Sequence, residues 1–143
     1  MSAPILAPAA MLVLWSMVVL FWVMFTRFPA FKQAGIDLGA SPPGGRYQDI
    51  QGAMPDRVNW KSHNYTHLME QPTLFYAVVA VLALAGDTST LNTNLAWAYC
   101  GLRVMHSIWQ GLFNTVPVRF TFFLLSSLCL LVLAVNAVRI TLF

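Results

Sequence analysis

Four stretches of the chain are dominated by apolar residues, and each reaches the roughly 20 residues that an α-helix needs to cross a bilayer. They cover residues 5–26, 58–85, 92–114 and 118–142. The second stretch changes character along its length, because its first turns are polar and residues 70–85 are mostly apolar. The pattern therefore predicts four membrane-spanning helices, with the polar start of the second lying beyond the hydrocarbon.

The connections between these stretches predict how the helices are arranged. The links at residues 86–90 and 114–117 are short, and short links make neighbouring helices antiparallel. Residues 27–57 form a longer loop, rich in Gly and Pro, that is long enough to fold over the mouth of a site. The predicted fold class is all-α: a single membrane domain over residues 1–143, folded as a four-helix up-down bundle.

Composition agrees with a membrane protein. The chain is 58% hydrophobic and 9% charged, whereas an ordinary soluble domain carries about 25% charged residues. A chain of 143 residues cannot hide that much apolar surface from water, so lipid is the expected solvent. The net charge of +3 comes from scattered Lys and Arg without a basic run, which argues against a nucleic-acid partner. Cys100 and Cys129 lie within apolar stretches, where they read as small hydrophobic residues rather than a disulfide framework.

The first apolar stretch has two interpretations, a cleaved signal peptide or a retained span. It lacks a basic segment before the apolar run, and that run is longer than the ~7–15 residues of a signal-peptide core. We therefore favour a retained span.

Lys and Arg are concentrated on one side of the predicted bundle, which indicates its orientation. The first loop and its borders carry five basic residues, namely Arg27, Lys32, Arg46, Arg57 and Lys61. The opposite side carries Arg139 near the end of the last helix. Because cytoplasmic loops are enriched in Lys and Arg, we expect the first loop to be cytoplasmic and both termini to lie outside.

A polar stripe opens the second stretch. His63, His67 and Glu70 follow the spacing i, i+4, i+7 and so share one helix face just ahead of Pro72. Pro72 removes a helix hydrogen bond and predicts a kink beside Glu70. Two His and a carboxylate also suggest three ligands for zinc or iron. We favour polar lining at the mouth of the bundle and keep the metal site as an alternative.

The third stretch carries a second polar stripe on one helix face. Its members are Asn92, Tyr99, Arg103, His106, Ser107, Gln110 and Asn114. An Arg near mid-membrane costs about 2.5–3.5 kcal/mol on insertion scales, so it persists where it is paired or lines a wet cavity. Glu70 is the carboxylate available within the spans, and we expect an Arg103–Glu70 pair. The alternative is that the stripe only joins helices through hydrogen bonds.

Arg119 lies at the start of the fourth stretch, two residues after Pro117. One interpretation is a snorkelling Arg that marks the cytoplasmic edge of the membrane. The other is an anion clamp at the same end of the bundle as the His63, His67 and Glu70 stripe. Position in the sequence leaves both interpretations open.

Two motifs in this order resemble the MAPEG family, the membrane-associated proteins of eicosanoid and glutathione metabolism. They are Arg57…Glu70-Gln-Pro72-Thr-Leu-Phe-Tyr76 in the second stretch, and Arg103-x-x-His106 followed by Pro117-Val-Arg119. The resemblance covers nearly the whole chain. It implies a homotrimer in which glutathione binds between neighbouring subunits, against the second helix of one and the third and fourth of another.

The resemblance also assigns roles to residues. Glu70 would hold the amino group of glutathione, and Arg119 would stabilise its thiolate as the catalytic residue. His63, His67, Arg103 and His106 would complete the binding site, and the lipophilic co-substrate would arrive from the membrane.

The chain departs from the glutathione-using members at two of these positions. His67 and His63 stand where those members carry Asn and Arg. This pattern is closer to a divergent bacterial branch, which implies a multi-pass protein of a bacterial inner membrane. Two functions stay open: a glutathione-dependent transferase or peroxidase, and a non-catalytic lipid-binding or scaffold member, including an accessory subunit of a larger membrane complex.

Overall fold

The computed structural model describes residues 3–143, and over these residues the fold is all-α without strands. Four long helices make up most of the chain: α1 (Leu6–Gln33), α3 (Asp56–Leu84), α4 (Thr90–Leu112) and α5 (Val116–Leu142). Short helical turns lie between the first two, namely η1 (Leu38–Ala40), α2 (Tyr47–Ile50) and η2 (Gln51–Ala53).

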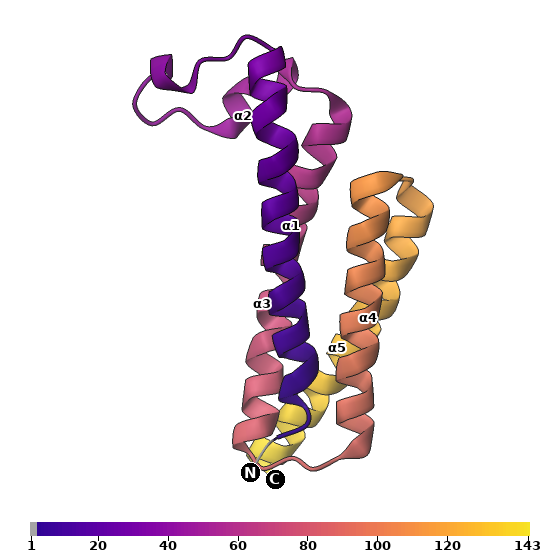
Figure 1. Cartoon of the computed structure of the whole chain (residues 1–143). Helices are drawn as coiled ribbons and strands as arrows, with labels where there is room; N and C mark the ends of the chain where they lie inside the picture. Colours follow the sequence, from indigo (N-terminus) through magenta and orange to yellow (C-terminus); the bar gives the residue numbers. More distant parts are fainter. Residues whose placement is uncertain (1–2) are drawn as a thin grey trace.

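The long helices run up and down side by side, with both chain ends at the same end of the bundle (Figure 1). Helix α1 packs along α3, and α4 packs along α5, while α3 and α1 also contact α4. The short turns η1, α2 and η2 lie at the opposite end, beside the end of α1 and the start of α3 (Figure 1). This arrangement leaves α3, α4 and α5 in mutual contact, and the candidate site lies among them.

Within residues 3–143, three helices are long and apolar enough to cross a membrane: α1, α3 and α5. Helix α4, which is 23 residues long and was predicted as a span, is not among them, because polar side chains cover one of its faces. The chain is therefore an integral membrane protein built from helices.

Residues 27–57, predicted as a loop, are more helical than their Gly and Pro content suggested. Helix α1 continues to Gln33 and includes Pro29. The extension buries Ala30 and Phe31 against Met54, which forms a small second core at this end of the bundle. The loop predicted from residue 27 therefore begins after Gln33, because the apolar spacing after Arg27 continues the helix.

Helix α4 turns its polar stripe inward, as its periodicity predicts. Tyr99, Arg103 and Ser107 are fully buried, and His106 and Gln110 are nearly so. The ring of Tyr99 stacks on that of Phe75 from α3, with 4.2 Å between their centroids. The polar face of α4 thus points into the interior of the bundle, and its apolar face is available to lipid.

Specific residues determine where α4 and α5 begin. Ser89 caps α4 by accepting a hydrogen bond from the backbone N–H of Asn92. Between α4 and α5, Asn114 adopts a positive φ of 54°, a left-handed conformation that Asn tolerates better than most residues. Pro117 follows in the first turn of α5, where its missing N–H costs no hydrogen bond.

Candidate functional site

A cavity of about 210 Å³ opens where α3, α4 and α5 meet. Three of the side chains predicted to form a site line it, one from each helix: His67, His106 and Arg119. Its remaining wall is apolar and comes from α5 and its first turn, with Val116, Phe120 and Phe123. The cavity therefore combines basic groups with a hydrophobic wall.

The two imidazoles of the cavity lie next to each other. The ring centroids of His67 and His106 are 5.5 Å apart. The ring of His67 also meets that of Phe123 edge to face, at 6.2 Å and 86°. His106 is 2% exposed, whereas 36% of the His67 side chain is accessible. His67 thus forms the outer part of the pair and His106 the inner part.

Arg119 enters the cavity from the first turn of α5. Its Nη1 donates a hydrogen bond to Oδ1 of Asn114 at 2.8 Å. The left-handed turn at Asn114 brings this amide back toward the start of α5. The guanidinium is therefore held by a neutral partner, and no carboxylate of the described part of the chain lies within ion-pair distance of it.

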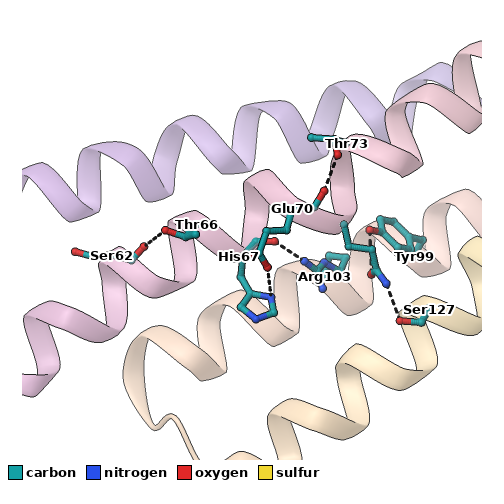
Figure 2. A network of polar contacts seen from close by, with 9 residues as sticks. Ser62, Thr66, His67, Glu70, Thr73, Tyr99, Arg103 and Ser127 are labelled. Carbon is teal, nitrogen blue, oxygen red and sulfur yellow. Dashed lines mark hydrogen bonds and ion pairs between the residues drawn. The ribbon is translucent and has the colours of Figure 1, made fainter. Parts of the chain in front are cut away.

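Arg103 lies beside His67, which lines the cavity, and is fully buried (Figure 2). Its Nη2 donates to the backbone carbonyl oxygen of His67 at 2.8 Å. Its Nε and Nη1 are buried and have no hydrogen-bond partner among the described residues. The guanidinium carbon also lies 6.0 Å from the centroid of the Phe123 ring. A buried cation with two free donors marks a site for an acceptor.

The predicted Arg103–Glu70 pair is wrong. Within residues 3–143 the one contact of ion-pair distance joins Nδ1 of His67 to Oε2 of Glu70, at 3.7 Å (Figure 2). The Glu70 side chain is 57% exposed and stays on the outer side of α3. Because Arg103 finds the carbonyl of His67 within reach, it bonds to the backbone of α3 rather than to this carboxylate.

A polar chain below Arg103 was missed by the sequence analysis. Gln71 donates from Nε2 to the Ser127 hydroxyl at 2.8 Å and accepts from the Tyr99 hydroxyl at 3.4 Å (Figure 2). These bonds join α3, α4 and α5. A lone Gln beside Glu70 gives no periodic signal, so the sequence offered no means of finding it.

His63 lies away from the cavity. Its Nε2 is 3.0 Å from Nε2 of Gln51, and the ring is exposed. Among residues 3–143, His, Cys, Asp and Glu side chains form no group of three that could hold a metal. The alternative of a metal bound by His63, His67 and Glu70 therefore finds no support in the geometry.

Asn64 is a further buried polar residue that the sequence analysis did not select. It is fully buried, and neither its amide nitrogen nor its oxygen has a partner among the described residues. It lies on α3 one turn before His67 and close to Gly111 of α4.

Comparisons with known proteins agree with the architecture. The model of the MAPEG family matches residues 5–139. Neither the curated proteins nor the solved structures gave a match.

Proposed function

The chain belongs to the MAPEG family, and we propose on that premise that it is a glutathione-dependent transferase or peroxidase acting on a lipophilic electrophile. The observation that supports this proposal is the shared cavity of Arg119, His67 and His106 against the aromatic wall of α5. A basic group beside an apolar wall suits a reaction between an anionic nucleophile and a hydrophobic partner.

The residues present fit an anionic thiol ligand. Arg119 brings a guanidinium group to the cavity, and Arg103 keeps two buried donors without a partner among the described residues. Glutathione offers two carboxylates and a thiol as acceptors. Glu70, exposed beside His67, would hold its ammonium group. The donor set thus matches the charges of the tripeptide, with positive groups inside and the carboxylate at the rim.

Arg119 would stabilise the thiolate. A free thiol has a pKa of about 8.5, and a neighbouring guanidinium favours the ionised form. Once bound, the ligand supplies the nucleophilic sulfur, so the chain itself needs no covalent nucleophile. Arg119 would orient and hold this charge, while Phe120 and Phe123 would admit the electrophile from the bilayer.

The size of the cavity favours assembly of several subunits. Pockets that enclose a drug-sized ligand measure about 300–1,000 Å³, whereas this cavity measures about 210 Å³. One chain therefore encloses part of a tripeptide, and a neighbouring copy would cover the rest. This supports the proposed homotrimer. The distribution of Lys and Arg supports a first loop in the cytoplasm and termini outside, and we propose four spans per subunit in a bacterial inner membrane.

Glutathione titration of the purified protein in detergent tests the proposal. We expect ultraviolet thiolate absorbance to rise with glutathione, together with conjugation of an aryl halide. Arg119→Ala should abolish the thiolate signal, and Arg139→Ala is the matched control because it removes an exposed Arg from the far end of the same helix. Absence of any thiolate signal at millimolar glutathione would overturn the enzymatic function.

A second function, lipid binding without catalysis, is favoured by a different feature. A groove of about 480 Å³ lies between α1 and α4, lined by apolar side chains such as Met11, Trp15 and Met105. Such a groove suits a hydrocarbon chain. Retention of lipid by the purified protein, with no thiolate signal, would favour this function or a role as an accessory subunit over the enzyme.

A further inference from the structure

His67 shares the cavity with Arg119 and is the more accessible of the two imidazoles there. We propose that His67 is the proton donor of the site, passing a proton from Nε2 to the oxygen released when a hydroperoxide is reduced. This inference rests on the proposed function, because it requires a thiolate held by Arg119.

Glu70 determines which nitrogen of His67 is available. Nδ1 of the imidazole lies 3.7 Å from Oε2 of Glu70 and is buried without a hydrogen-bond partner in residues 3–143. The group that faces one ring nitrogen decides which tautomer the imidazole adopts. With Nδ1 directed at the carboxylate, Nε2 is the nitrogen left for a ligand in the cavity.

Exposure selects His67 over His106 as the donor. A proton donor must regain its proton from water in every catalytic cycle. The His67 side chain is 36% accessible, whereas His106 is 2% exposed and lies behind it at 5.5 Å. Phe123 contacts the His67 ring edge to face and holds it at the mouth of the cavity.

The charged groups around the ring come from all three helices. Glu70 on α3 is negative, while Arg103 on α4 and Arg119 on α5 are positive. Arg103 also fixes the backbone at this point through the carbonyl oxygen of His67. A thiolate bound at Arg119 would add a second negative group on the cavity side, so that an imidazolium at His67 would lie between two anions.

The proposed step balances. His67 gives its proton to the alkoxide oxygen as the O–O bond of the hydroperoxide breaks, which yields an alcohol. The glutathione sulfur that attacks the terminal oxygen is oxidised to a sulfenic acid. A second glutathione converts it to the disulfide with release of water, and His67 regains its proton from the solvent.

The test compares two reactions in one variant. In His67→Ala we expect kcat for reduction of a lipid hydroperoxide to fall of the order of 100-fold, the usual contribution of a general acid. Conjugation of an aryl halide should fall much less than hydroperoxide reduction, because chloride leaves without a proton, so the ratio of the two losses separates proton donation from binding. Added imidazole should restore much of the lost hydroperoxide reduction. His63→Ala is the matched comparison, since it removes an exposed imidazole one turn earlier on α3.

A spectroscopic measurement complements the rates. The chain has three His, so the 15N-labelled imidazoles are assigned by comparing single variants. Glutathione should shift the Nε2 resonance of His67 and leave that of His63 in place. His67→Gln serves as a second variant if His67→Ala does not fold.

Several results would overturn the inference. Undiminished hydroperoxide reduction in a His67 variant that still forms the thiolate would exclude His67 as donor and leave the proposed function standing. An equal loss of hydroperoxide reduction in His63→Ala would also exclude it. So would a His67 Nε2 resonance that does not shift when glutathione is added. If the unmodified protein forms no thiolate, both the inference and the proposed function fail.

Discussion

At the scale of single residues, Arg103 is the side chain whose burial most needs an explanation. It is fully buried in a membrane helix and makes one hydrogen bond, to a backbone carbonyl. Burying a charge without a counter-ion costs several kcal/mol, and a stability role does not account for keeping it. A ligand anion that uses Nε and Nη1 does account for it.

We therefore predict opposite effects of Arg103→Met on stability and on binding. The free energy of unfolding in detergent should stay the same or rise by about 1–4 kcal/mol, because Met has an unbranched side chain that fills part of the same space and carries no unpaired charge. The Kd for glutathione should rise at least about tenfold, since hydrogen bonds to charged groups are worth roughly 1.5–3 kcal/mol. Thermal unfolding and the thiolate titration measure the two effects. A large loss of stability with unchanged binding would assign Arg103 a purely structural role.

The sequence correctly predicted which face of α4 points inward, but it did not predict the hydrogen-bond partner of Arg103. Helical periodicity identified the inward face of α4, and Arg103 and His106 lie on it. The same periodicity could not decide between Glu70 and the His67 carbonyl as the partner of Arg103. That choice depends on side-chain rotamers and on the depth of each residue, which spacing along a helix does not contain.

At the scale of elements, the close approach of α1 and α4 depends on one glycine. A Cβ at Gly111 would lie 2.6 and 2.7 Å from two ring carbons of Trp22 on α1. Gly111→Ala should therefore destabilise the protein by about 1–3 kcal/mol through overpacking. Gly101 lies on the same helix with no atom within 4 Å of an added Cβ, and Gly101→Ala should stabilise it by about 0.5–1 kcal/mol.

Thermal unfolding of the two variants in detergent checks this prediction. Trp22→Leu in the Gly111→Ala background should recover part of the loss, because the smaller side chain leaves room for the new methyl group. Equal responses of Gly101→Ala and Gly111→Ala would show that Trp22 moves aside at little cost.

The long helices were predictable from the sequence because one local property, the length of an apolar stretch, determines each of them. They appear where apolar stretches were found. The end of α1 was missed because the residues after Arg27 are amphipathic and pack on the short turns before α3. That packing joins segments more than 20 residues apart, so reading each stretch separately did not reveal it.

At the scale of the whole molecule, the question is which subunit supplies each part of the site. The family resemblance implies that the second helix of one subunit meets the third and fourth of another. In this chain, however, His67 from α3 lines one cavity with His106 and Arg119 from α4 and α5. Glu70 contacts that same His67. The geometry within one chain therefore favours Glu70 and Arg119 acting in a site of the same subunit.

Co-expression of two inactive variants decides between these arrangements. We expect that Glu70→Ala subunits mixed with Arg119→Ala subunits stay inactive in aryl halide conjugation, because every site then carries one defect. If the two residues came from different subunits, random mixing in a cyclic oligomer would rebuild about a quarter of the sites. Recovery near that level, with trimers confirmed by crosslinking, would contradict a same-subunit site. Its absence, with each variant folded and assembled, would leave the neighbouring copy the role of covering a site that one chain has already assembled.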